Sequence, residues 1–449
     1  MHGVQHVRTD GRAGQARQAP HGDASTWLDR EAVEALYETP AQPGTKGLPL
    51  TAAGLTLGDV AHSGWNVLTD GLPMPVMLLK QTALQTNLAV MVAYCEQYGV
   101  ALCPHGKTTM SPQLFRRQIE AGAWGLTAAT PAHLRLYRRF GVQRIIYANQ
   151  LVEPAVIDWL ATELERSPEF DFYCLVDSVR GAELLEAGLS GRTARVGVLV
   201  EVGYAGGRGG VRSRDAARQV AAAVDAAPSL ELVGIECFEG LLGGTDPAAL
   251  ARVDEFLGFV RDVAADLQAG SSLSRAPEMI VSAGGSAYFD RVISAFGGGQ
   301  TPARLILRSG CYLTQDGGFY ADASPLDRRR DGPPLLRDAI EIWSAVLSRP
   351  EPGLAITSLG RRDAPQDKGM PIPTAAVVDG GPPSRLEGAS VTALSDQHAH
   401  VLVDPGCALG PGDLVGFAIS HPCTAFDRWR LIPVVDDAYV VCDAILTFF

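Results

Sequence analysis

The residues best suited to chemistry in this chain lie in a short segment around Lys107. An apolar run at residues 100–103 predicts a buried strand, and Pro104-His105-Gly106-Lys107-Thr108 follows it directly. In barrel enzymes the carboxyl end of a strand faces the active site, so Lys107 would stand at the mouth. A partly desolvated lysine amine loses its proton readily and attacks carbonyl carbons, which is the chemistry of a Schiff base. Taken alone, the segment also fits a solvated loop lysine, because charged side chains are mostly exposed.

Two glycine-rich loops further along the chain predict a phosphate site. They are Ser282-Ala283-Gly284-Gly285-Ser286 and Ser309-Gly310-Cys311-Tyr312, and each follows a predicted strand. Barrels often bind phosphate with the loops after strands seven and eight, where backbone N–H groups cradle the anion. Gly106-Lys107-Thr108 does not complete a nucleotide-binding P-loop, since Ala101 stands where that motif requires glycine. An amine facing two phosphate loops fits a phosphorylated aldehyde instead, and pyridoxal 5'-phosphate (PLP) has this shape.

An alternation of strand-like and helix-like segments predicts the fold that positions these loops. With residues 100–103 as the first strand, eight strands and their helices form a (β/α)8 TIM barrel, an α/β fold. A ninth run, at residues 76–80, is assigned to another domain. The remaining barrel strands are expected at residues 124–128, 144–148, 172–177, 194–202, 232–237, 279–282 and 304–308, and helices at 82–98, 131–140, 154–165 and 247–268.

Beyond residue 320 the pattern changes to short β-rich runs separated by proline and glycine, which predicts an all-β C-terminal domain. Its strands are expected at residues 340–349, 375–378, 400–403, 414–419, 434–435 and 439–446. The predicted organisation is a disordered tail at 1–25, an N-terminal segment at 26–80 that packs on the β-domain, the barrel at 81–320 and the β-domain at 321–449.

Composition excludes several classes of protein. The 449 residues carry a formal net charge of −12 and no long basic run, which argues against nucleic acid as a partner. No apolar run is long enough for a membrane span, and the first 25 residues lack the apolar stretch of a secretory signal. The eight cysteines are scattered, several within apolar runs, as expected of reduced thiols in a cytoplasmic protein.

Motifs in order along the chain resemble those of the D-serine dehydratase and D-threonine aldolase family, whose fold joins an alanine-racemase-like barrel to a C-terminal β-domain. Pro104 to Thr108 reads as its PHGKT motif, and Val200 to Val211 is similar to its VEVDxGxxRxGV stretch. The two glycine-rich loops correspond to its SGGTP-like and PGxY phosphate elements. Further similarities lie at Gly360 to Pro371, at Ser395-Asp396-Gln397-His398, and at Gly412-Asp413 with His421-Pro422-Cys423.

The resemblance implies roles for individual residues. Lys107 would hold PLP and act as the catalytic residue, and Arg208 would contact an oxygen of the cofactor ring, where a permanent cation lowers the pKa of a phenolate. His105 is expected to be structural. The implied phosphate-binding residues are Gly284, Gly285, Ser286, Gly310, Cys311 and Tyr312. The chain departs from the family pattern at Gly203, Ala205, Ser286-Ala287 and Asp396-Gln397, which points to a divergent branch with an altered substrate.

The pair His421 and Cys423 determines which member of the family the chain resembles more. By spacing alone H-x-C is a weak metal motif, although residues two apart on an extended segment share a face and can reach one ion. The resemblance implies a Zn²⁺ held by this pair, with water and the substrate hydroxyl completing its shell. Aldolase relatives tend to have an acidic residue at the cysteine position, so Cys423 favours dehydratase chemistry. His398 and His400 are possible additional ligands.

These inferences together predict a PLP- and zinc-dependent lyase that converts a β-hydroxy D-amino acid, most simply D-serine, into a 2-keto acid and ammonia. The D configuration and an expected homodimer come only from the resemblance. An aldolase or racemase on the same scaffold is the alternative. A non-catalytic PLP carrier of the single-barrel type is disfavoured by the residues after the barrel, and a metal-free sugar-phosphate enzyme is more distant still.

Overall fold

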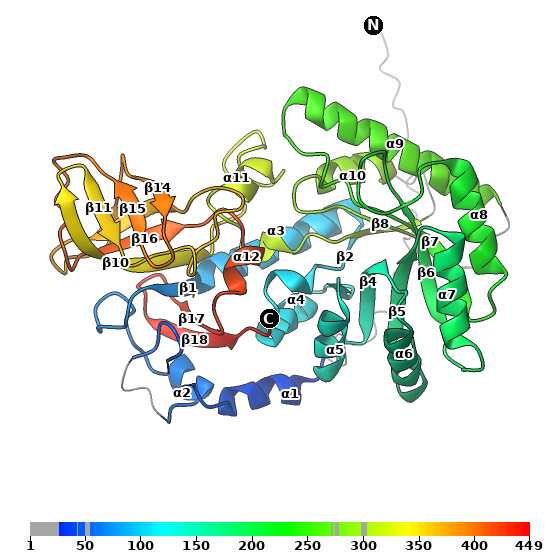
Figure 1. The fold of residues 1–449 in the computed structure, drawn as a ribbon, viewed down its shortest axis with the longest axis horizontal. Coiled ribbons are helices and arrows are strands. Elements are labelled where there is room, and N and C mark those ends of the chain that lie inside the picture. The colour runs from blue at the N-terminus through cyan, green and yellow to red at the C-terminus, as the bar shows by residue number, and fades with distance from the viewer. Residues whose placement is uncertain (1–26, 43, 50–53, 271–272, 274–277, 298–302) are drawn as a thin grey trace, which may run out of the picture.

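In the computed structural model, eight parallel strands form a curled sheet surrounded by helices (Figure 1). The structure describes residues 27–42, 44–49, 54–270, 273, 278–297 and 303–449. The predicted tail at 1–25 lies outside these residues. The strands, in chain order, are β2 (Ala101–Leu102), β3 (Leu126–Ala128), β4 (Arg144–Gln150), β5 (Asp171–Val176), β6 (Val196–Val202), β7 (Leu230–Cys237), β8 (Met279–Ala283) and β9 (Ala303–Leu307).

The sheet closes into a barrel because its first strand lies beside its last. β2 pairs with β9, and a bridge between His105 and Thr127 joins the end of β2 to β3. Small and branched apolar side chains from successive strands fill the interior, because alternate residues of each strand face inward. This inner cluster consists of Cys103, Ile146, Leu175, Leu199, Val233, Ile280 and Ile306.

Helices cover the outside of the barrel. They are α3 (Gln81–Tyr98), α4 (Pro112–Glu120), α5 (Pro131–Arg139), α6 (Pro154–Arg166), α7 (Val179–Leu189), α8 (Arg214–Asp225), α9 (Pro247–Ala269) and α10 (Phe289–Phe296). Their boundaries follow local chemistry. The Asp246 carboxylate accepts N–H groups of Ala248 and Ala249 at the start of α9, and Pro247 occupies a first-turn position where its missing N–H is not needed.

The second sheet contains ten strands and takes one of them from before the barrel. β1 (Val76–Lys80) pairs antiparallel with β10 (Ile340–Glu351) and parallel with β17 (Leu431–Val435). The main path runs β13-β12-β16-β10-β1-β17-β18, with β11, β14 and β15 attached beside β10. The other bounds are β11 (Leu354–Thr357), β12 (Ile372–Val377), β13 (Ser384–Arg385), β14 (Ser390–Leu394), β15 (Ala399–Leu402), β16 (Leu414–Ala418) and β18 (Val441–Leu446).

The N-terminal segment contacts both parts of the molecule. Helix α2 (Leu57–Ala61) packs on β18, and the Tyr37 hydroxyl donates to Asp443 at 2.7 Å. Helix α1 (Arg30–Glu34) instead lies against α4 of the barrel, where Arg30 pairs with Glu120 at 2.9 Å. The expectation that this segment packs on the β-domain was therefore incomplete, because its first helix contacts the barrel.

The predicted fold class is confirmed: an alanine-racemase-like barrel is joined to an antiparallel β-domain that includes an early strand. All eight barrel strands lie at the predicted places. β11, β13 and β14 were not predicted because they are short and none of them is buried along its whole length. None of the helices in the described part of the chain has the length and apolar character required to cross a membrane.

We predict that Ile342→Ala weakens the second sheet strongly. Ile342 is fully buried in β10, between Met77 of β1 and Phe417 of β16. Truncation of a buried isoleucine to alanine lowers the free energy of unfolding by about 2–5 kcal/mol. Urea unfolding followed by circular dichroism would show a lower midpoint. Leu347→Ala, on the same strand but 49% exposed, is the control, and an equal shift in both variants would contradict this packing.

Candidate active site

A cavity of about 820 Å³ lies at the carboxyl ends of the barrel strands and reaches the C-terminal domain. Lys107 enters it from the 3-10 turn η3 (Gly106–Thr108), directly after β2. The loops after β7, β8 and β9 and helix α11 (Phe319–Ala323) form its walls. His421 and Cys423 enter from the C-terminal domain, so one chain supplies both the lysine and the expected metal pair.

The Lys107 amine faces open space within the cavity. Its side chain is exposed there, and among the described residues it has no hydrogen bond or ion pair. Desolvation by the surrounding protein lowers the pKa of Lys107; the charges of Cys423 and Cys311 oppose this shift, and the guanidinium groups of Arg208 and Arg308 add to it. A lysine with a lowered pKa is more often neutral and can act as a nucleophile or a base.

His105 lies beside Lys107 and lines the same cavity. Its Nδ1 is buried and has no hydrogen-bond partner within the described structure. Burial holds the pKa of His105 well below its usual value, so the ring is neutral. A buried polar atom without a partner is uncommon in folded proteins, and its position at the cavity wall suits a bound polar group.

The two glycine-rich loops lie at adjacent strand ends and meet in space. The Cys311 N–H donates to Ser286 Oγ at 3.3 Å, which joins the loop after β9 to the loop after β8. A Cβ on Gly310 would lie 2.7 Å from both His105 O and Thr108 Oγ1, so only glycine fits between the loop and the lysine turn. Gly285, Ser286, Gly310 and Cys311 all line the cavity. The backbones of these residues come close together, an arrangement that fits a phosphate group.

Three of the predicted cofactor residues do not line this cavity. Gly284 has a φ of +85°, a backbone conformation that favours glycine. Its carbonyl accepts hydrogen bonds from the backbone N–H of Arg308 and from the Ser309 hydroxyl. Tyr312 is buried, and its hydroxyl accepts a hydrogen bond from Gln118 at 3.2 Å. Arg208 packs over the ring of Phe238, which does line the cavity, with its guanidinium 5.1 Å from the ring centre. Their contacts with the cofactor stay predictions.

His421 and Cys423 lie close together, but not on an extended segment. Pro422 has helical dihedral angles and Cys423 opens helix α12 (Cys423–Phe426), so the expected strand-like alternation was wrong. The fixed φ of proline favours a helix start at this point. The two side chains nevertheless hydrogen-bond, and contacts with Cys311 and His421 hold the pKa of the Cys423 thiol well below its usual range.

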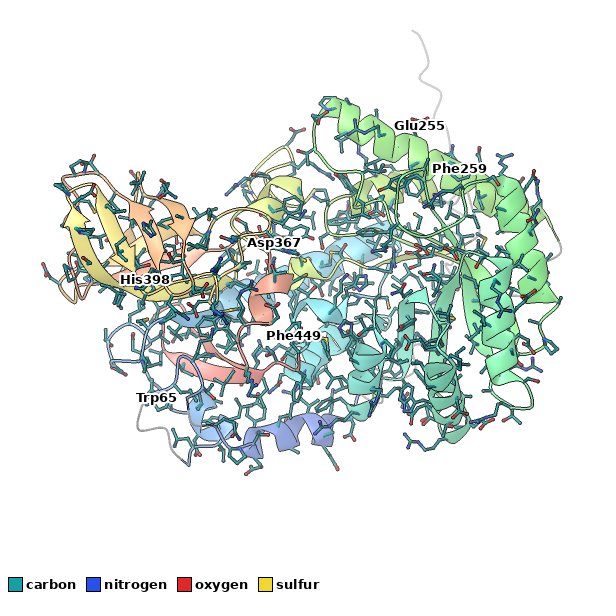
Figure 2. All side chains as sticks on the ribbon, viewed as in Figure 1. Trp65, Glu255, Phe259, Asp367, His398 and Phe449 are labelled. Atoms are coloured by element: carbon teal, nitrogen blue, oxygen red, sulfur yellow. The ribbon has the colours of Figure 1, made fainter. Side chains whose placement is uncertain are left out.

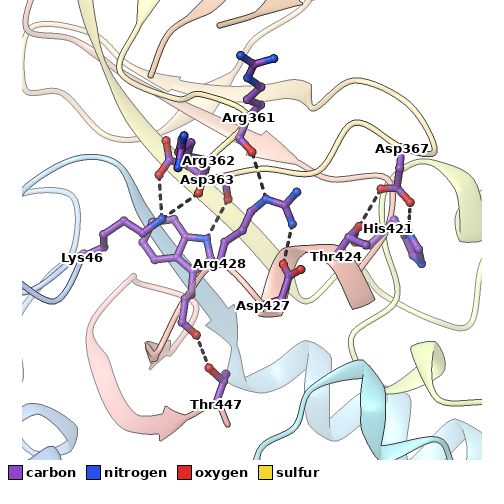
Figure 3. Close-up of polar contacts among 11 residues, drawn as sticks. Lys46, Arg361, Arg362, Asp363, Asp367, His421, Thr424, Asp427, Arg428 and Thr447 are labelled. Atoms are coloured by element: carbon purple, nitrogen blue, oxygen red, sulfur yellow. Dashed lines mark hydrogen bonds and ion pairs between the residues drawn. The ribbon is translucent and has the colours of Figure 1, made fainter. Parts of the chain in front are cut away.

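Asp367 orients His421. Its carboxylate lies 2.5 Å from His421 Nδ1, and its other oxygen accepts the Thr424 hydroxyl at 2.8 Å (Figure 3). Burial alone would lower the pKa of His421, but hydrogen bonds with Cys423 and Asp367 raise it overall. Because Nδ1 is held by Asp367, Nε2 is the nitrogen left for a ligand. A carboxylate behind a histidine is the usual support for metal binding.

The loop that carries Asp367 is anchored at its other end. Asp363 accepts the Lys46 amine at 3.0 Å and its carbonyl accepts the Trp429 indole N–H at 2.9 Å (Figure 3). Lys368, the residue after Asp367, lines the cavity mouth with its amine 5.0 Å from the centre of the Phe319 ring.

His398 and His400 do not join this site. His400 lies within β15, paired with Ile356 of β11, and His398 lies among strands of the C-terminal sheet, apart from Asp367 (Figure 2). Neither lines the cavity. Within the described parts of the chain, no group of three or more His, Cys, Asp or Glu side chains is arranged to hold a metal ion.

The sequence analysis did not single out Arg308, which lines the cavity floor. Its guanidinium forms a buried ion pair with Glu236 at the end of β7 and donates to Cys237 O at 2.8 Å. Burial, opposed by Arg308, raises the pKa of Glu236 to about 7. The sequence signal that could have identified Arg308 is a charged residue directly after the apolar end of a barrel strand.

Comparisons with known proteins agree with this architecture. The family model "Alanine racemase, N-terminal domain" matches residues 79–289, and "Putative serine dehydratase domain" matches residues 339–435. A D-threonine aldolase of Arthrobacter sp. is 26% identical over 82% of this chain and 90% of its own length. A 3-hydroxy-D-aspartate aldolase of Paracoccus denitrificans (strain Pd 1222) is 27% identical over 66% of this chain and 74% of its own.

Solved structures show the same fold. The crystal structure of D-threonine aldolase from Filomicrobium marinum superposes with a TM-score of 0.69 at 22% identity, covering 91% of this chain and 97% of that one. D-threo-3-hydroxyaspartate dehydratase from Delftia sp. HT23 superposes with a TM-score of 0.66 at 20% identity, covering 84% and 98%. With two family models matched in order along one fold, the chain is similar to the D-serine dehydratase and D-threonine aldolase family of PLP-dependent enzymes.

Proposed function

We propose that this protein is a PLP- and zinc-dependent lyase that converts a β-hydroxy D-amino acid, most simply D-serine, into a 2-keto acid and ammonia. The observation that carries the proposal is that Lys107 and the pair His421 and Cys423 line one cavity. Family relatives that act as D-threonine or 3-hydroxy-D-aspartate aldolases support lyase chemistry on D-amino acids. A homodimer and a cytoplasmic location stay predictions from the sequence.

The residues present fit PLP. Lys107 supplies a free amine, and the backbones of the loops at Gly285–Ser286 and Gly310–Cys311 come close to the turn that carries it. His105, whose buried Nδ1 has no partner within the described structure, lines the same cavity. PLP, when bound, supplies an electron sink for the carbon that loses a proton.

Lys107 has two tasks in this account. Its Nζ would hold the cofactor aldehyde, and as a free amine it would take the α-proton from the substrate. Both tasks need an amine that is neutral for part of the time, which its lowered pKa provides. Helix α11 and the loop of Phe238 line the cavity that this amine enters.

The residues also fit zinc. His421 offers Nε2, Cys423 offers a thiolate, and imidazole and thiolate are ligands that suit Zn²⁺. Zinc would supply a Lewis acid for the β-hydroxyl of the substrate. In the D-threo-3-hydroxyaspartate dehydratase, one solved structure replaces a histidine and another, in a metal-free form, replaces a cysteine two positions later. That spacing matches His421 and Cys423 and supports the dehydratase over the aldolase alternative.

Product analysis with and without a chelator tests the proposed reaction. We expect keto acid and ammonia from D-serine, D-threonine or 3-hydroxy-D-aspartate, and none from the L-enantiomers. Chelation should slow the reaction at least about tenfold, because the Lewis acid stabilises the leaving hydroxyl, and added zinc should restore it. Glycine and an aldehyde without keto acid would establish the aldolase alternative, and the enantiomer alone would establish a racemase. A bound cofactor with no product would indicate a carrier.

Lys107→Ala should abolish the visible absorbance of covalently bound PLP after dialysis, because Lys107 is the lysine on the turn that packs against the glycine-rich loop at Gly310. The matched control is Lys368→Ala, which removes a second lysine from the same cavity and should keep the absorbance. Retention of the band in the Lys107 variant, or its loss in both, would show that Lys107 does not hold the cofactor.

Asp367→Asn should weaken zinc binding by about 10–100-fold, the usual effect of losing a carboxylate behind a ligating histidine. Titration of the metal-free protein with zinc, followed by a competing indicator, measures this directly. Asp427→Asn is the control, because Asp427 follows the C-terminal end of α12 and pairs with the adjacent Arg428 (Figure 3). Equal affinities in the two variants would remove Asp367 from the metal site.

A further inference from the structure

Two cysteine sulfurs lie in contact inside the cavity. Cys311 Sγ is 3.6 Å from Cys423 Sγ, although the two residues come from different parts of the fold. Cys311 opens the 3-10 turn η5 (Cys311–Leu313) after β9, and Cys423 opens α12 of the C-terminal domain. Both line the cavity and both are free thiols.

Each sulfur is held in place by neighbours. Cys423 Sγ lies 3.5 Å from Thr108 Oγ1, and the same hydroxyl is 4.0 Å from Cys311 Sγ. The Cys311 backbone is fixed by its hydrogen bond to Ser286. The two side chains therefore face one another on packed elements, and a bond between them needs the sulfurs to approach by about 1.5 Å, since a disulfide is about 2.05 Å long.

The function proposed above does not account for Cys311. The metal pair consists of His421 and Cys423, and Cys311 contributes its backbone N–H to the phosphate loop. It occupies the variable position of the PGxY-like element, where any side chain would leave that N–H available. A thiol at this position adds one property that other side chains lack, which is the ability to form a disulfide with Cys423.

We propose that Cys311 and Cys423 are a redox pair, and that a peroxide converts them into a disulfide that closes the metal site. Cys423 is the more accessible of the two. Its sulfur attacks a peroxide oxygen and the thiol proton joins the departing oxygen, so that hydrogen peroxide gives a sulfenic acid and water. The Cys311 thiol then attacks that sulfur, forms the disulfide and releases a second water. Two thiols lose two electrons, hydrogen peroxide gains them, and a dithiol reverses the reaction.

The bond has two consequences. A sulfur in a disulfide is no longer a thiolate, so His421 loses its partner as a metal ligand. The disulfide also ties the phosphate loop after β9 to α12. The first consequence rests on the proposed zinc site, whereas formation of the disulfide does not.

Peptide mapping tests the pair directly. The full-length protein is treated with hydrogen peroxide in zinc-loaded and chelator-treated forms, alkylated, digested and analysed by mass spectrometry, with free thiols counted in parallel. We expect a peptide that joins Cys311 to Cys423, loss of two of the eight thiols and recovery of both with dithiothreitol. In the zinc-loaded protein the link should form more slowly and release zinc to a chromophoric indicator.

Cys311→Ser separates this role from metal binding. It keeps both proposed zinc ligands, His421 and Cys423, but its Cys423 should oxidise beyond the stage that dithiothreitol reverses. Cys442→Ser, which removes an exposed cysteine outside the cavity, should behave like the unmodified protein.

Thiol loss that maps to Cys442 or Cys407 without the Cys311–Cys423 link would overturn the proposal. So would unchanged reversibility in Cys311→Ser. Mapping of the unmodified protein decides the question even if that variant does not fold. A protein that forms the link but binds no zinc would disprove the metal site and leave the redox pair intact.

Discussion

One contact between the two parts of the chain underlies the site: the turn that carries Lys107 lies against helix α12. Thr108, the residue after the lysine, touches Cys423, and the N–H of Phe448 near the C-terminus donates to Met110 O, just beyond the turn. Lys107 belongs to the barrel and the proposed metal pair to the C-terminal domain, and this packing brings them into one cavity. Figure 1 shows α12 between the C-terminal sheet and the barrel.

The charges around the turn are arranged so that the lysine remains reactive. Arg308 pairs with Glu236 inside the barrel, and Asp367 is directed at His421. Among the described residues, no carboxylate pairs with the Lys107 amine. Desolvation outweighs the opposing charges of Cys423 and Cys311, so the pKa of Lys107 is lowered and its neutral form is favoured. The same barrel mouth thus combines an amine that can lose its proton with a thiol and an imidazole that can take a metal.

Much of the barrel and the positions of Lys107 and the phosphate loops could be predicted from the sequence, because barrel strands give strong local signals. The run at residues 100–103 placed Lys107 at a strand end, and the spacing of the later strands placed both phosphate loops at neighbouring ends. The local conformation at Pro422 was not predictable from the H-x-C spacing, since proline allows both extended and helical starts. The contact of Cys311 with Cys423 depends on how two domains pack, and no local pattern encodes it. Arg308 was missed because its partner Glu236 is 72 residues earlier in the chain.

The most direct test of the central claim is reduction of the purified protein with borohydride, followed by peptide mapping. If Lys107 holds PLP, borohydride fixes the cofactor to its side-chain nitrogen, and the peptide that contains residues 104–108 carries the added pyridoxyl mass. The account predicts that this peptide alone is modified. Modification of a different lysine, or no modification in a protein that retains the cofactor, would contradict it.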